Sequence, residues 1–195
     1  MPKKNQLTTS DHLEYSEYER LLECLHNDKE YFWELYARLG FCTACRVSDI
    51  LNLKWCDVLN KSQHIVAEKK TKKARLISFN TSVQKKIKEL HALLGKPDVN
   101  EYIFTSRVTT EPVTIQYVNQ KLKKFKLKYR IKIGNFSTHT FRKTFGRYVY
   151  DKHNHSAESL MLLNRILCHS NIDITKTYIG ITQDEINDIF NSIAF

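Results

Sequence analysis

Six residues scattered along the chain are of the types needed to cleave a phosphodiester bond without a metal ion. Guanidinium groups neutralise the non-bridging phosphate oxygens, and an acid protonates the leaving oxygen. A tyrosine phenol can attack phosphorus and keep the bond energy in a covalent phosphotyrosine. The sequence offers no acidic cluster of the kind that a magnesium nuclease needs, so we expect no metal and no cofactor. The candidate residues are Arg46, Lys70, His139, Arg142, His169 and Tyr178.

Each of these residues also has an ordinary structural explanation. His139 and Arg142 stand three positions apart in "HTFR", and His169 stands nine positions before Tyr178. Taken singly, either histidine is typical of a hydrogen-bonded structural histidine, and Tyr178 is one of ten tyrosines, which mostly serve packing. Lys70 alone would be a solvated lysine, and the first arginine alone fits the end of a helix equally well. Their joint occurrence is what favours one catalytic site.

The net charge of +10 is confined to one region of the chain. Residues 1–60 carry seven Lys or Arg and ten Asp or Glu, a net of −3, whereas residues 61–180 carry 24 and eight, a net of +16. The last fifteen residues carry three acids and neither Lys nor Arg. Such clustering is expected of a surface that meets a polyanion, although a basic protein without a nucleic-acid role would have the same net charge. We therefore expect a nucleic acid as the partner.

Two basic segments are the candidates for that contact. "KKTKKAR" has five basic residues in seven at what we expect to be a hairpin turn, although a solvated turn explains it equally well. "KLKKFKLKYRIK" has seven in twelve, and its lysines repel one another at helical spacing. A polyanion would relieve that repulsion. The residues expected to contact nucleic acid are Lys69, Lys72, Lys73, Arg75, Lys121, Lys124 and Lys128.

The spacing of apolar residues predicts a mainly helical domain with a small antiparallel β-sheet, an α+β fold. The first helix should start after a Ser10 cap, the second should end at Gly40, and a short third one should be capped by Ser48. "EYIFTS" is interpreted as a short strand, and residues 63–80 as a β-hairpin. Further helices are expected near residues 81–95, 114–129, 138–151, 156–168, 172–179 and 182–193, the last with an apolar stripe of Ile186, Ile189, Phe190 and Ile193.

The five cysteines are interpreted as reduced thiols of a cytoplasmic protein, associated with the nucleoid if the source is bacterial. Their number is odd, and no apolar signal segment precedes them. Cys42 and Cys45 in "CTAC" have metal-like spacing, but no second pair lies nearby, which argues against zinc. The sequence has no run of 18 apolar residues, so we expect no association with a membrane.

Taken together, these motifs resemble the catalytic domain of the tyrosine recombinases, the phage-type integrases, over nearly the whole chain. "GFCTACRVSDILNLKW" is similar to the segment of the first catalytic arginine, which falls at Arg46, with the family's acidic supporting residue at Asp49. "HTFR" matches the His-x-x-Arg motif, and "LCHSNIDITKTY" resembles the segment of the second histidine and the nucleophile. "KKTKKARLI" resembles the hairpin of the catalytic lysine, at Lys70, with Lys69 and Lys72 as alternative registers.

The resemblance implies a role for each residue. Arg46 and Arg142 would clamp the scissile phosphate and stabilise its developing charge. His139 and His169 would hydrogen-bond that phosphate, and His139 would assist proton transfer from the tyrosine. The lysine would protonate the leaving 5′ oxygen, and Tyr178 would become a 3′-phosphotyrosine. Because the reverse steps join a different strand, neither metal nor ATP would be needed.

The resemblance further implies a site-specific recombinase or integrase of a mobile element. Residues 1–195 would form a single catalytic domain with no N-terminal core-binding domain, as in the short fimbrial phase-switch inverters; a truncated chain is the alternative. Cys168 stands where the family usually has Gly. The implied partners are double-stranded DNA, three further copies in a homotetramer on DNA and an accessory DNA-bending protein. The C-terminal apolar stripe would dock on a neighbouring copy or pack within its own chain.

Two other functions would fit the same residues. A type IB topoisomerase shares the chemistry but relaxes supercoils as a monomer without a defined target. A non-catalytic DNA-binding protein on a recombinase scaffold would keep the basic surface and lose the chemistry.

Overall fold

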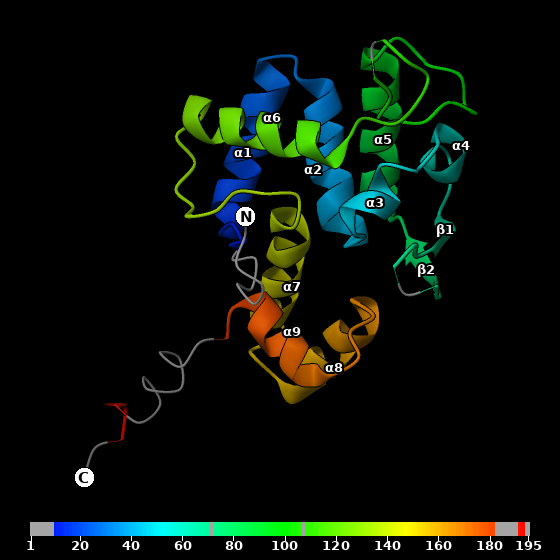
Figure 1. The fold of residues 1–195 in the computed structure, drawn as a ribbon. Coiled ribbons are helices and arrows are strands. Elements are labelled where there is room, and N and C mark those ends of the chain that lie inside the picture. Colours follow the sequence, from blue (N-terminus) through cyan, green and yellow to red (C-terminus); the bar gives the residue numbers. More distant parts are fainter. Residues whose placement is uncertain (1–9, 71, 107, 182–190, 194–195) are drawn as a thin grey trace.

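The computed structural model describes residues 10–70, 72–106, 108–181 and 191–193. In these residues, helices dominate and one two-stranded antiparallel sheet is present, which confirms the expected α+β class. Figure 1 shows α1, α2 and α5 side by side, α6 lying across them, and α7 leading away to α8 and α9. The elements are α1 (Tyr15–Asn27), α2 (Tyr31–Thr43), α3 (Val47–Ile50), α4 (Trp55–Val58), β1 (Gln63–Ala67), β2 (Ala74–Ser78), α5 (Thr81–Leu93), α6 (Ile115–Lys128), α7 (Thr140–Lys152), α8 (Ala157–Ile166) and α9 (Ile172–Ile179).

Helix α2 is the centre of the main core. It packs against α1, α5 and α7, and its Trp33, Tyr36 and Leu39 are almost fully buried. A Cβ on Gly40 would lie 3.1 Å from the Cβ of Phe141, so glycine lets the first turn of α7 approach α2 closely. This approach brings the start of α7, with its "HTFR" motif, next to the end of α2.

The end of α2 lies farther along the chain than the sequence predicted. Gly40 is inside the helix, which continues to Thr43 and ends at Ala44 in the left-handed conformation, with φ of +48°. Gly40 is therefore a packing residue and not a helix end. The extra turn sets Arg46 directly before α3, where its backbone forms the N-cap.

Two expected caps were also wrong. Ser48 lies inside α3, and α1 begins only at Tyr15, well after Ser10. The Ser10 hydroxyl is buried and lies 3.1 Å from Thr140 Oγ1 at the start of α7. For Ser10, this tertiary contact outweighs the local preference of the hydroxyl for a helix end, whereas the Ser48 hydroxyl donates to the carboxylate of the neighbouring Asp49.

The predicted hairpin is present. Strand β1 pairs with β2 so that Ile65 faces Leu76 and His64 faces Ile77. Val66 and Ile77 point into the core, whereas Ile65 and Leu76 are exposed. The four lysines of "KKTKK", in the turn between the strands, are exposed.

Two further expectations concern the segment "EYIFTS" and the C-terminal helix. The segment "EYIFTS" forms only isolated bridges, of Tyr102 with Lys54 and of Thr105 with Pro112, so it is not a strand. Of the helix expected over residues 182–193, all but residues 191–193 lie outside the described part of the chain. Ile193, the one described member of its apolar stripe, is exposed. No helix in the described residues is long and apolar enough to cross a membrane.

A second, smaller core joins α7, α8 and α9. Leu160, Leu163 and Ile179 are buried in it, and Ile179 follows Tyr178 directly. A Cβ on Gly146 of α7 would lie 2.8 Å from Cγ2 of Ile179. Glycine at this position therefore sets the distance between α7 and the helix that carries Tyr178.

We expect Gly146→Ala to destabilise the protein. The β-branched side chain of Ile179 is stiff and fully buried, so the added methyl group overpacks the contact, at a cost of about 1–3 kcal/mol. The higher helix propensity of alanine returns only about 1 kcal/mol. Urea denaturation measures the net loss, with Lys88→Ala on the exposed face of α5 as the control. A variant more stable than the parent by the full helix-propensity gain of about 1 kcal/mol would show that α7 and α9 are not in close contact here.

Candidate active site

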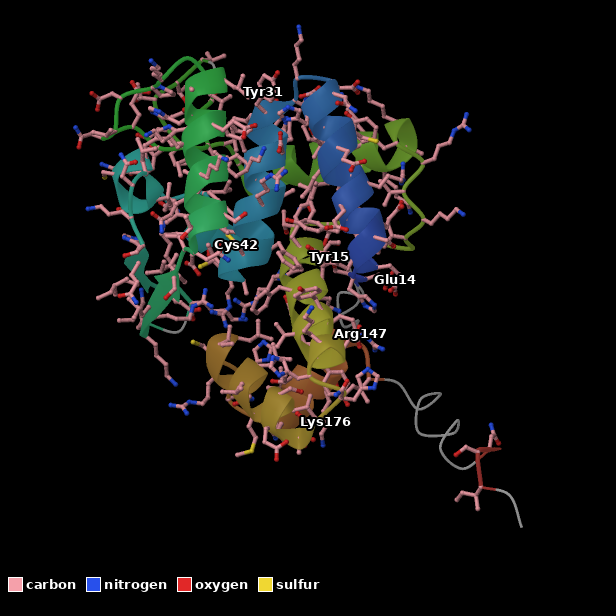
Figure 2. All side chains as sticks on the ribbon, turned by 180° about the vertical axis from the view of Figure 1, so that it is seen from behind. Glu14, Tyr15, Tyr31, Cys42, Arg147 and Lys176 are labelled. Carbon is pink, nitrogen blue, oxygen red and sulfur yellow. The ribbon has the colours of Figure 1, made fainter. Side chains whose placement is uncertain are left out.

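The six candidate residues come from five separate places in the fold. One arginine precedes α3, the lysine lies in the β1–β2 turn, a histidine and an arginine start α7, a histidine lies between α8 and α9, and the tyrosine lies in α9. Figure 2 shows nitrogen-rich side chains gathered between the end of α2, marked by Cys42, and the pair α8–α9. The fold therefore brings residues that are up to 132 positions apart in the sequence to one side of the molecule.

Tyr178 lies at the centre of this cluster. Its phenol oxygen is 3.5 Å from Nδ1 of His139, and its ring meets the His169 ring edge to face, with centroids 5.0 Å apart. The guanidinium carbon of Arg142 lies 5.8 Å from its ring centroid. The side chain is half-buried and so remains within reach of a ligand. Burial raises the pKa of Tyr178 and nearby Arg142 opposes that rise, so the phenol carries its proton at neutral pH.

Two carbonyl groups fix the direction of Arg142. Its guanidinium donates to the carbonyl oxygen of Ala44 and, at 2.6 Å, to that of Leu167. The side chain is buried, and this burial lowers its pKa, although a guanidinium stays charged at any physiological pH. The left-handed end of α2 and the C-terminal end of α8 thus hold the same arginine from two sides.

Arg46 shares one of these acceptors. It donates to the Leu167 carbonyl at 3.5 Å and forms an ion pair with the buried carboxylate of Glu68. A guanidinium has five N–H donors, so both arginines keep donors for an anion. Two guanidiniums on one carbonyl group form a strongly cationic site beside the phenol of Tyr178.

The two histidines are neutral at pH 7. His169 Nδ1 lies 3.0 Å from the Thr175 hydroxyl, which orients the ring from within α9. Burial, followed by Arg142 and Arg46, lowers the pKa of His169 to about 4. Burial, followed by Arg142, Lys143 and Arg46, lowers the pKa of His139. A neutral imidazole can accept a proton, whereas an imidazolium cannot.

Acidification from pH 7 to pH 4 is expected to destabilise the fold through His169. Its pKa is about 4 in the folded protein and near 6.5 in an unfolded chain, so the unfolded state binds the proton first. The unfolded state therefore gains as the pH falls below 6.5, by up to about 3 kcal/mol at pH 4. Urea denaturation of the parent and of His169→Gln measures this as the difference between their pH profiles. Parallel profiles would contradict the low pKa.

The β1–β2 turn is tied to the site by Asp49. This carboxylate is buried, and its Oδ1 accepts hydrogen bonds from the Lys69 backbone N–H at 3.1 Å and the Ser48 hydroxyl at 3.3 Å. Lys70, which follows Lys69, is exposed. Its charge lowers the pKa of both histidines, with a smaller effect than burial and the arginines. Asp49 thus holds the backbone of the turn, and the side chain of Lys70 is exposed beside it.

The described residues show no group of three His, Cys, Asp or Glu side chains arranged to hold a metal ion. The cluster instead consists of guanidinium, imidazole, amine and phenol groups. Its chemistry suits the binding of an anion next to a nucleophile.

Comparison with known proteins decides the family. The pattern of the Phage integrase family matches residues 11–185. The probable integrase/recombinase YoeC of Bacillus subtilis (strain 168) is 36% identical over 158 residues, which is 81% of this chain and 81% of that protein. This chain belongs to the phage integrase family.

Two other relatives are longer proteins, and this integrase matches only part of each. A tyrosine recombinase of Pseudothermotoga lettingae (strain ATCC BAA-301 / DSM 14385 / NBRC 107922 / TMO) is 26% identical over 185 residues, which is 94% of this chain and 60% of that protein. The crystal structure of the XerA recombinase superposes with a TM-score of 0.72 and 21% identity over 95% of this chain and 66% of that one. The fold is therefore that of a tyrosine recombinase catalytic domain, and the chain spans about two thirds or less of these two relatives.

One of the cations that the sequence predicts to contact DNA, Arg75, is not on the surface. Arg75 of this integrase is buried and donates to the Ile166 carbonyl at 2.7 Å and to Cys45 Sγ at 2.7 Å. Its alternating position in β2 points it inward, beside Ile77, so it is a structural arginine and not a surface cation.

The other nominated lysines belong to two separate places. Lys69, Lys72 and Lys73 are exposed in the hairpin turn, whereas the remaining three lie on α6. Figure 1 places α6 across one end of the molecule, away from the hairpin, and Figure 2 agrees. Lys128 forms an ion pair with Asp28 at 2.7 Å, while Lys124 is exposed and Lys121 is half-buried.

Two residues of the site escaped sequence reasoning. Lys143 places its amine 5.2 Å from the centroid of the Tyr178 ring, and burial lowers its pKa. Glu68 binds Arg46 from the end of β1. Lys143 directly follows the HTFR motif, and Glu68 is an acid amid the basic hairpin; these were the only sequence signals for either residue.

Proposed function

We propose that this integrase domain cuts and rejoins DNA strands at specific sites through a 3′-phosphotyrosine at Tyr178, without metal or ATP. The observation that carries the proposal is the half-buried phenol of Tyr178 beside two neutral imidazoles and two guanidiniums. Such a constellation would bind a phosphodiester and hold the nucleophile against it.

In the proposed cleavage step, the phenol oxygen of Tyr178 forms a bond to phosphorus as the bond from phosphorus to the 5′ oxygen breaks. The phenol proton passes to Nδ1 of His139, which lies 3.5 Å away and is neutral at pH 7. Lys70, which is exposed in the hairpin turn, delivers a proton to the departing 5′ oxygen. Arg46 and Arg142 neutralise the charge that develops on the non-bridging oxygens. Attack of another strand's 5′ hydroxyl on the phosphotyrosine reverses these transfers and completes the exchange.

The proposed partner is double-stranded DNA, contacted by the exposed lysines of the hairpin turn and of α6. The net charge of +16 on residues 61–180 supports this, because phosphate contacts dominate DNA affinity. A solved structure of the Tn1549 transposon integrase, with a TM-score of 0.70, is a complex with transposon right end DNA. We therefore place the scissile phosphate between the hairpin and the helices α8 and α9.

We further propose that four copies assemble on DNA, with an accessory DNA-bending protein where the target requires one. A lambda integrase structure with a TM-score of 0.64 is a dimer bound to a core site, so a structural neighbour places more than one copy on DNA. Sedimentation with and without a cleavable duplex tests the assembly. A tetramer that is stable without DNA would contradict it.

Capture of the covalent intermediate tests the chemistry. The protein is incubated in EDTA with a pool of nicked duplexes of randomised sequence, in which the nick lets the cleaved strand diffuse away. A DNA adduct that survives denaturing electrophoresis is the expected result, and sequencing of the trapped DNA identifies the target. Absence of any adduct, with DNA binding intact, would favour a non-catalytic DNA-binding protein. Relaxation of plasmids that lack the target would favour a type IB topoisomerase.

A further inference from the structure

A buried carboxylate lies among the cations of the site. Glu68 is one of only eight acids among residues 61–180, and its side chain is fully buried. It forms an ion pair with Arg46, and its Oε1 lies 3.6 Å from Nε of Arg75. A carboxylate loses its hydration on burial, so its presence here requires the two guanidiniums, and their arrangement in turn depends on it.

Both guanidiniums that bind Glu68 also reach the C-terminal end of α8. Arg75 donates to the carbonyl of Ile166 at 2.7 Å, and Arg46 donates to that of Leu167 at 3.5 Å. Arg142 donates to the same Leu167 carbonyl at 2.6 Å. Three arginines therefore converge on one helix end, and the carboxylate between two of them offsets part of their mutual repulsion.

The backbone of Glu68 closes the turn that carries Lys70. Its N–H donates to the Lys73 carbonyl at 3.0 Å, and its carbonyl accepts from the Lys72 N–H at 2.9 Å. One residue thus contacts Arg46 through its side chain and borders the lysine turn through its main chain. A shift of the carboxylate would move both.

We propose that Glu68 is a positioning residue that sets Arg46 and the Lys70 turn together for cleavage. This inference rests on the proposed function. The ion pair holds one edge of the Arg46 guanidinium and leaves its other donors for phosphate. The same anchor keeps the root of the hairpin turn at a constant distance from that guanidinium. Glu68 itself does not touch the DNA.

Glu68→Gln tests this because it keeps the shape of the side chain and removes its charge. Cleavage of the trapped duplex is measured in single turnovers, with the ordinary 5′ oxygen and with a sulfur atom in its place. A thiolate leaves without a proton from an acid, so the sulfur substrate no longer depends on the lysine. DNA affinity is measured separately by fluorescence anisotropy.

We expect Glu68→Gln to cleave the oxygen substrate roughly 100-fold more slowly, because misplacement of about 1 Å has an effect of this size. The DNA Kd should stay within about twofold of the parent, since the carboxylate is fully buried and we expect it to make no contact with the DNA phosphates. The defect on the sulfur substrate should be at least about tenfold smaller, because the part due to Lys70 disappears. Glu89→Gln, which loses an exposed ion pair with Lys86, is the matched control and should match the parent.

Three results would overturn the inference: an unchanged rate, an equal defect on both substrates, or a loss confined to DNA affinity. Denaturation curves establish that the variant is folded. If it is not, Glu68→Asp, which keeps the charge and shortens the side chain, is run on the same two substrates against the same criteria. Failure of the parent itself to form an adduct would instead overturn the proposed function, so the two failures are distinguishable.

Discussion

Replacement of Tyr178 by phenylalanine is expected to abolish the covalent DNA adduct, lowering its rate of formation by more than about 10⁴-fold. Phenylalanine keeps the ring contact with His169 and the cationic contacts with Arg142 and Lys143, and it loses only the hydroxyl. Because that hydroxyl contacts only polar groups of the site, His139 at 3.5 Å and Arg142, and the ring packing is kept, the fold and the DNA affinity should remain close to those of the parent. Denaturing electrophoresis and fluorescence anisotropy measure the two properties.

The control for this variant is Tyr148→Phe. Tyr148 lies on α7 and packs its ring at a tilt against that of Tyr15, with ring centroids 4.5 Å apart, outside the catalytic cluster. It should form the adduct at the parental rate. An adduct that persisted in Tyr178→Phe would mean that another side chain is the nucleophile, and peptide mapping of the trapped DNA would identify it.

Arg142→Lys is expected to lower the cleavage rate by about 10²–10³-fold while leaving the charge of the site unchanged. The guanidinium of Arg142 is held by two carbonyls, at Ala44 and at Leu167, and keeps further donors for the phosphate. An ammonium group has three donors on a flexible stem, so it cannot bind both carbonyls and a phosphate in this geometry. Single-turnover cleavage and the DNA Kd, measured in parallel, separate the loss of rate from a loss of binding.

The arginine prediction has its own control on the same helix. Arg147 pairs with Asp151, with 3.0 Å between Nε and Oδ1, and a lysine can keep that ion pair. Arg147→Lys should therefore cleave at close to the parental rate. If Arg142→Lys did so as well, charge alone would suffice at this position, and the forked geometry would have no role.

Much of the architecture follows from local patterns. Apolar residues at helical spacing predict α2, α5 and α6, and β-branched residues on both sides of "KKTKK" predict the hairpin. These features are local, because a helix or a hairpin depends mostly on residues within a few positions of one another. The same patterns misplaced the end of α2 and the caps at Ser10 and Ser48. Ser10 instead contacts Thr140 at the start of α7, a contact that no local pattern reveals.

The sequence also nominated the residues of the candidate site, although it could not measure their distances. The order of motifs around Arg46, His139 and Tyr178 indicated one site, because these segments resemble, in the same succession, the catalytic motifs of the tyrosine recombinases. Burial is a property of the folded chain, so Arg75 counted as a surface cation until its contacts with Ile166 and Cys45 were known.

By itself, then, the sequence determined the class of fold and the family, and it nominated the side chains that we propose to bear the chemistry. Only the tertiary structure decided which of these side chains lie close together. It showed that the Leu167 carbonyl accepts hydrogen bonds from two arginines, and that Glu68 lies between Arg46 and Arg75. The physical reason is that the type of a side chain is known from its own position in the sequence. Its burial, its pKa and its partners depend on segments that are distant in the chain and become adjacent only after folding.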